Sequence, residues 1–149
     1  MSVDKESGAF LHLTSKVIGD MKEITENLNR VLEQVESATL EGLMRFGRAI
    51  LERSNFYVPK DTGTLEKSGF VSMTGGERPS VSAGASPAVT VGYDGNGEAP
   101  YAVFVHELLH LQHKPPTQAK FLQQAMEEIR NEAERLVQEE IRKQIGSTR

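Results

Sequence analysis

The stretch Tyr101-Ala102-Val103-Phe104-Val105-His106-Glu107-Leu108-Leu109-His110 decides how this chain folds, because it fits two kinds of structure. It contains the pattern His-Glu-x-x-His, which on a helix places two imidazoles on one face, where both can bind one Zn²⁺. Its first five residues are apolar and rich in β-branched and aromatic types, which favours a buried strand. We expect the strand, with His106 and Glu107 at its end.

The alternative interpretation is a zinc-dependent metallopeptidase. In that case His106 and His110 bind the metal, and Glu107 acts as the general base that activates a bound water. Glu132, in the segment that follows, is the candidate third protein ligand.

Two prolines argue against a metal-binding helix here. Pro115 and Pro116 end any helix at about His113, because the residue before a proline is pushed out of the α region. The longest possible helix is then about two turns. On a strand the two imidazoles would diverge, so we expect no metal, no other cofactor and no enzymatic activity.

The composition sets broader limits. The chain has 149 residues, which fits a single domain, and no cysteine, which excludes disulfides and thiolate chemistry. It contains no apolar run of membrane-spanning length and no signal-peptide pattern, so we expect a soluble protein made in the cytoplasm. The net charge of −4 argues against wrapping nucleic acid, because phosphate binding needs a basic surface.

The N-terminal third predicts a long helix. After a polar arm (residues 1–17), residues 18–56 carry apolar side chains every three or four positions, which is typical of one helical face. Gly42 and Gly47 indicate a bend or a close crossing, and Glu41 and Arg45 have the spacing of a helical ion pair. Such a helix would be about 55 Å long, more than a small domain covers by itself, which indicates oligomerisation. The apolar positions are Ile24, Leu28, Leu32, Val35, Leu43, Phe46 and Ile50.

The segment after this helix predicts a capped turn. Pro59 stiffens it, Asp61 or Thr62 is the expected N-cap of a short helix, and Gly63 permits an unusual backbone angle. Leu65 is expected in the core. Asp-Thr-Gly is also the triplet of aspartic proteases, but there it lies between apolar strands, whereas charged residues flank it here.

The rest of the chain predicts a small sheet and a final helix. Strands are expected at 70–73, 88–93 and 101–105, with a flexible loop at 74–87. After the two prolines, Thr117 is the expected cap of a helix that runs to about Ile145. The fold class is therefore α+β, with a long N-terminal helix, a short helix, a three-stranded antiparallel sheet and a long C-terminal helix in one domain of residues 18–146.

The order of these parts resembles a known family. Val-Pro-x-Asp-Thr-Gly-x-Leu-x-x-Ser, a Val-Gly-Tyr strand, Tyr-Ala-Val-Phe-Val-His-Glu and Gln-Ala-Lys-Phe-Leu together are similar to the minor tail component proteins of tailed bacteriophages, over about residues 20–145. The matching positions are Pro59, Asp61, Thr62, Gly63, Leu65, Ser68, Gly92, Tyr101, Ala102, Val105, Glu107, Pro116, Lys120, Phe121 and Leu122.

The resemblance implies a structural virion protein of the neck, at the head–tail junction. It would form a ring of six or twelve copies, as a tail-completion, tail-terminator or connector protein. Its partners would be itself, the head connector and the tail tube, with DNA passing through the ring without specific binding. One departure is that Leu108-Leu109 stand where the family often has glycine, and we expect these leucines and Leu111 to pack against a neighbouring subunit.

Overall fold

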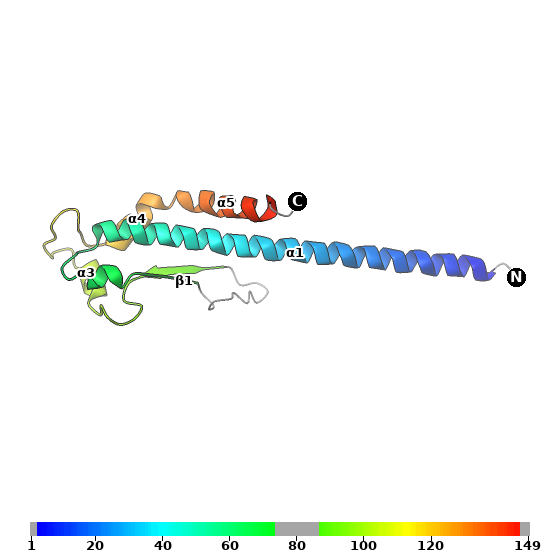
Figure 1. The fold of residues 1–149 in the computed structure, drawn as a ribbon, viewed down its shortest axis with the longest axis horizontal. Helices are drawn as coiled ribbons and strands as arrows, with labels where there is room; N and C mark the ends of the chain where they lie inside the picture. The colour runs from blue at the N-terminus through cyan, green and yellow to red at the C-terminus, as the bar shows by residue number, and fades with distance from the viewer. Residues whose placement is uncertain (1–2, 74–86, 147–149) are drawn as a thin grey trace.

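The computed structural model describes the backbone of residues 3–73 and 87–146, and side chains from residue 16 onward. Its central element is helix α1 (Val3–Tyr57), which runs along most of the length of the molecule (Figure 1). The predicted helix over residues 18–56 is confirmed, and residues 3–17 of the predicted arm continue it. No proline interrupts this stretch of sequence, so the helix reaches about 80 Å.

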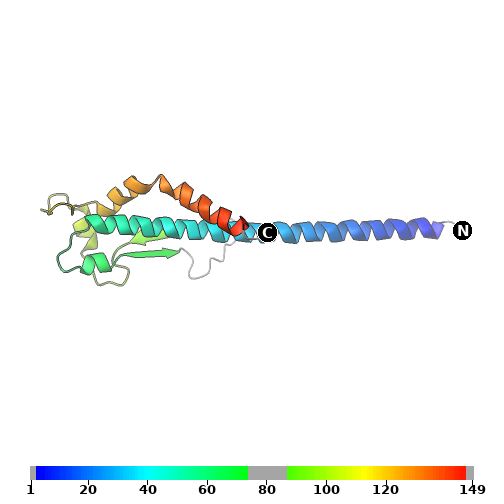
Figure 2. The same ribbon diagram turned by 45° about the horizontal axis from the view of Figure 1, so that its top comes forward.

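Helix α1 is the middle layer of three. Helices α4 (Phe121–Ile129) and α5 (Glu132–Gly146) pack on one side of it, and the strands β1 (Phe70–Met73) and β2 (Val89–Gly92) lie on the other (Figures 1 and 2). Gly42 and Gly47 of α1 lie where α5 and the sheet pack most closely on the helix. A Cβ at Gly42 would lie 2.5 Å from the Cα of Val137, and one at Gly47 would lie 2.7 Å from Cγ1 of Val71.

The sheet has two antiparallel strands in the described residues, with Phe70 opposite Gly92 and Met73 opposite Val89. The α+β class and the first two strands are confirmed, and the three-stranded sheet is wrong. Residues 101–105 lie at the start of helix α3 (Ala102–Glu107) instead. The predicted loop 74–87 falls, except for Pro87, outside the described residues.

The segment 102–107 is helical because of what it packs against. Ala102 is buried and Val105 is half-buried, while Val103 and Phe104 between them are exposed, which is a helical and not an alternating pattern. The amide of Val105 donates to the carbonyl of Tyr101 at 3.1 Å, and that of Leu108 donates to Phe104 at 3.0 Å. Tertiary packing thus overrides the strand preference of β-branched residues.

The predicted C-terminal helix is two helices. Lys120, with φ of 56°, precedes α4. The helix is interrupted around Arg130, and α5 begins after it. Thr117 does not cap the helix, because its hydroxyl donates to the carbonyl of Lys114 at 2.6 Å. The apolar side chains of Phe121, Ala125 and Leu136 are buried.

Where α1 ends, the small elements enclose one cluster of buried side chains. It consists of Val58, Leu65, Ala99, Ala102 and Phe121. Short helix α2 (Thr64–Lys67) contributes Leu65, as predicted. None of the helices in the described part of the chain combines the length and apolar character that a membrane span requires.

Candidate functional site

The most unusual surface of the molecule is the part of α1 that extends past the other elements. Figures 1 and 2 both show α1 continuing alone beyond the C-terminal end of α5. We call residues 3–33 the overhang. From residue 16 to residue 33 every side chain is exposed. The large apolar side chains among residues 16–33, which we call the stripe, are Val17, Ile18, Met21, Ile24, Leu28, Val31 and Leu32.

The stripe continues the face of α1 on which α5 packs. Following the same spacing of three and four residues, the helix reaches Ala38, which is fully buried, and then Gly42. Gly42 lies directly under Val137 of α5. Arg45 of α1 also bonds Glu140 of α5 at 2.5 Å. The same face of α1 is therefore covered by α5 from about Ala38 onward and exposed to solvent in the overhang.

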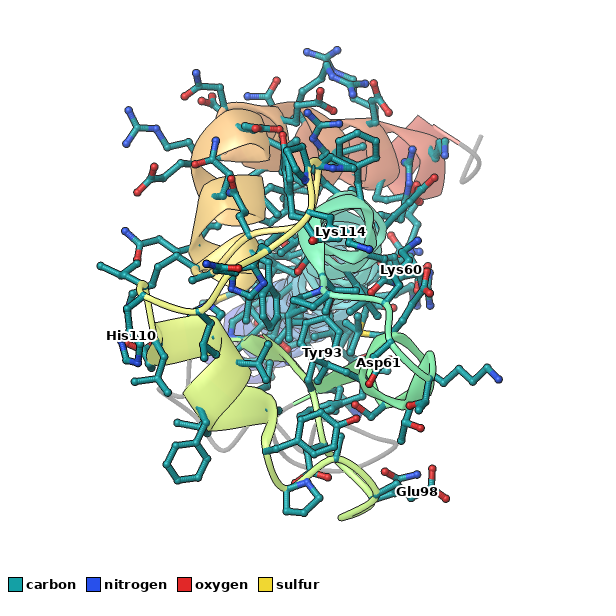
Figure 3. The ribbon with its side chains drawn as sticks, turned by 90° about the vertical axis from the view of Figure 1, so that its left-hand side faces the viewer. Lys60, Asp61, Tyr93, Glu98, His110 and Lys114 are labelled. Carbon is teal, nitrogen blue, oxygen red and sulfur yellow. The ribbon has the colours of Figure 1, made fainter. Side chains whose placement is uncertain are left out.

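A second exposed apolar surface lies at the other end of the molecule. Val103, Phe104 and Leu109 are 69%, 65% and 75% exposed, and we call them the α3 patch. They belong to α3 and the loop that follows it. This end is far from the start of α1 (Figure 1) and faces the viewer in Figure 3.

The residues of the zinc hypothesis have other roles. Nδ1 of His106 lies 2.7 Å from Oε1 of Glu107, and the ammonium of Lys120 bonds the other carboxylate oxygen. Lys120 first, and then His106, lower the pKa of Glu107. The amide of Lys120 also donates to the carbonyl of His106 at 2.7 Å. Glu107 thus ties the end of α3 to the start of α4.

The other two proposed ligands lie apart from this pair. Helix α3 ends at Glu107, and Leu108 is extended with φ of −81° and ψ of 97°, so His110 is outside the helix. Figure 3 shows His110 at the edge of the molecule. Glu132 bonds Arg135 at 2.9 Å within α5. Over the described residues, no three His, Cys, Asp or Glu side chains are placed to hold a metal ion.

The Asp-Thr-Gly segment lines a groove. The groove measures about 470 Å³ and is bordered by Pro59, Asp61, Thr62, Gly63, Thr64, Leu65, Glu98, Tyr101 and Val105. The structure therefore brings the motif positions Pro59, Asp61, Thr62, Gly63 and Leu65 together with Tyr101 and Val105. Figure 3 shows Asp61 and Glu98 on the same side of this end, away from His110.

The turn itself is built differently from the prediction. Gly63, with φ of 77°, occupies the N-cap position of α2, and no side chain caps the helix there. The expected N-cap position of Asp61 or Thr62 is wrong, but the Thr62 hydroxyl does accept a hydrogen bond from the Thr64 amide, the first of the helix, at 3.4 Å. The left-handed angle explains the glycine. Ser68 is buried and donates to the carbonyl of Leu65 at 2.7 Å, which closes the turn.

Two polar clusters were not visible in the sequence. The hydroxyl of Tyr93 lies 2.8 Å from Oγ of Ser54 and 2.7 Å from Oδ1 of Asn55. Burial raises the pKa of Tyr93 to about 12. Arg53 bonds Glu128 and donates to the Tyr57 hydroxyl at 2.9 Å. Both clusters join α1 to segments more than 35 residues away in the chain, and local spacing carries no signal for such pairs.

No protein-family model, curated protein or solved structure matches this chain.

Proposed function

We propose that this chain is a structural protein of a tailed bacteriophage, which assembles with copies of itself into a ring in the neck between head and tail. The proposal combines the sequence resemblance with one observation on the structure. That observation is the bare stripe on the overhang of α1.

The stripe supports an assembly role for a physical reason. An aliphatic side chain contributes roughly 1.5–3 kcal/mol when it is fully removed from water. Here seven such side chains lie in one row and are 45–65% exposed. Contiguous apolar surfaces of this kind mark contacts between proteins.

The α3 patch adds a second contact surface at the opposite end of the chain. The α3 patch gives each copy a second apolar surface for contact with its neighbours, and contacts repeated between neighbouring copies form a ring where the rotation closes. Leu109, with its side chain 75% exposed, is the strongest candidate for contact with a neighbouring subunit. In this proposal the virion neck holds six or twelve copies, with the head connector on one face and the tail tube on the other.

The first test is the mass of the native protein in solution. We expect one closed species of six or twelve copies that dissociates on dilution. Leu109→Asp should shift the distribution to smaller species, whereas Gln112→Asp, which places the same charge three residues away in the same loop, should not. A protein that stays monomeric at every concentration would contradict the ring.

The second test concerns the virion role. A ring that binds a purified head connector or tail tube protein of the same phage supports it. Genes for a portal, a major capsid protein or a tail tube protein beside the gene for this chain would support it as well. A ring that binds neither protein would leave self-assembly intact and remove the neck assignment.

A further inference from the structure

We infer that the overhang of α1 packs against the overhangs of other copies, in a parallel, in-register bundle of three or more helices along residues 17–35. This inference rests on the self-assembly in the proposed function and names the surface that carries it. It does not depend on the virion role.

The spacing of the stripe is that of a coiled coil. Apolar residues alternate at intervals of four and three over three heptads, with no polar residue among the seven core positions. Written as heptads, the d positions are Val17, Ile24, Val31 and Ala38, and the a positions are Met21, Leu28 and Val35. Ala38 is already covered in the body of the protein, so the free part of this seam ends near Val35.

The charges of the overhang fit an identical helix. The positions beside the seam are Ile18, Thr25 and Leu32 on one side and Asp20, Asn27 and Gln34 on the other, so only one of the six is charged. In a parallel, in-register pair Asp20 faces Thr25 of the next copy, and no like charges meet. Lys22 and Glu26 pair with each other at 3.9 Å on the outer face.

The residue types in the seam favour more than two helices. In parallel dimers the d position is typically Leu and the a position is β-branched, whereas Leu at a with Ile at d shifts the preference to trimers and tetramers. Here Leu28 is at an a position between Ile24 and Val31 at d positions. Ile18 and Leu32 widen the apolar surface beyond the seam, so each helix can contact two neighbours.

The described part of this chain does not cover the stripe. Helices α4 and α5 and the strands all pack on α1 within the body, and residues 16–33 stay exposed. Helix α5, which packs on this side of α1 together with α4, ends before the overhang begins (Figures 1 and 2). A ring with cyclic symmetry points all copies the same way, which makes the overhangs parallel.

Disulfide cross-linking tests the arrangement, and the chain has no cysteine that could interfere. In the parallel bundle Val17→Cys meets its own counterpart and should form covalent dimers on oxidation. Gly19→Cys lies on the opposite face, where a Cβ would have no atom of the described residues within 4 Å, and should not form them. Equal cross-linking of the two variants, or none with Val17→Cys in a protein that is oligomeric by mass, would overturn the bundle and leave the ring standing.

A second pair of variants tests how much the stripe contributes to the stability of the oligomer. Leu28→Asp should raise the dissociation constant of the oligomer at least tenfold. Gly19→Asp, which adds the same charge on the outer face, should change it less than twofold. The two variants and the wild type should have the same far-ultraviolet circular dichroism spectrum and the same melting temperature as monomers. Leu28 is exposed, so replacing it removes nothing from the core.

The number of copies is the last readout. A native mass of three or more copies, lost with Leu28→Asp and kept with Gly19→Asp, supports the inference. A dimer only, or an oligomer that Leu28→Asp leaves unchanged, overturns it. If the bundle forms and the protein binds no head or tail component, only the virion role fails.

Discussion

Val137 of α5 lies against Gly42 of α1 so closely that a Cβ on the glycine would be 2.5 Å from the Val137 Cα. Real Cβ atoms do not approach a backbone this closely, so the two helices touch only because position 42 has no side chain. This contact sets where α5 lies, and α5 in turn covers the apolar face of α1 up to the start of the overhang.

Gly42→Ala should therefore destabilise the fold. Alanine favours the helix by about 1 kcal/mol, but the clash with Val137 is expected to cost about 1–3 kcal/mol by forcing α5 outward. We expect a net loss in the free energy of unfolding, measured by urea denaturation. Gly19→Ala is the matched control on the same helix, since a Cβ there meets no atom of the described part of the chain within 4 Å. Equal stability of the two variants would contradict the close crossing.

Phe121 should be the most sensitive position in the core. It is 1% exposed, and its ring meets the edges of Tyr93 and His106 at centroid distances of 5.2 and 4.8 Å. Phe121→Ala is expected to lower the free energy of unfolding by about 3–5 kcal/mol. Phe104→Ala removes the same side chain from a site that is 65% exposed, and should change stability by about 0.5 kcal/mol or less. A large loss in the free energy of unfolding for Phe104→Ala would mean that the Phe104 side chain is buried and not part of an exposed patch.

The parts of the fold that follow one clear period were predictable from the sequence. The helix over residues 18–56, the first two strands and the buried face of the final helices each repeat apolar residues at a single spacing. The close crossings at Gly42 and Gly47 were also visible, since glycine in a helix interior needs a packing reason.

The segment 101–107 was not predictable, because its exposed positions are as apolar as its buried ones. Val103 and Phe104 face water, and with Ala102 and Val105 they make an unbroken apolar run in which a helical period cannot be recognised. Local composition then favours a strand, and this prediction was wrong.

Ion pairs between helices were equally hidden. The expected pair of Glu41 and Arg45 is replaced by contacts of Glu41 with Arg48 at 3.7 Å and of Arg45 with Glu139 and Glu140. The α5 partners are 94 and 95 residues away, and no local pattern indicates them.

Zinc analysis of untagged protein should find less than stoichiometric metal. His106 is held beside Glu107, and His110 lies beyond the end of α3, so the backbone does not hold the two imidazoles on one face of a helix. His110→Ala should leave the zinc content unchanged in elemental analysis after dialysis against micromolar zinc. One zinc per chain, lost in His110→Ala, would restore the hydrolase hypothesis.

The Arg53–Glu128 pair should make the packing of α4 on α1 sensitive to acid. Hydrogen bonds from Arg53, Gln124 and Tyr57 lower the pKa of Glu128 to about 2 from 4.5. A carboxyl whose pKa is lower in the folded state stabilises that state above its unfolded pKa, and this contribution is lost as pH falls toward the folded value. Glu128→Gln should therefore be less stable than the wild type above about pH 5, with the difference shrinking steadily toward pH 2.

The control for this pair is Glu127→Gln, which removes the same charge one residue away. Among the described residues the Glu127 carboxylate accepts a hydrogen bond from Gln123 alone, one turn earlier in α4, at 3.0 Å. Urea denaturation from pH 2 to pH 7 gives both curves. The Glu127→Gln curve should run parallel to the wild type, because no contact between helices is lost. A constant difference between wild type and Glu128→Gln across this range would mean that the carboxylate charge does not hold α4 to α1.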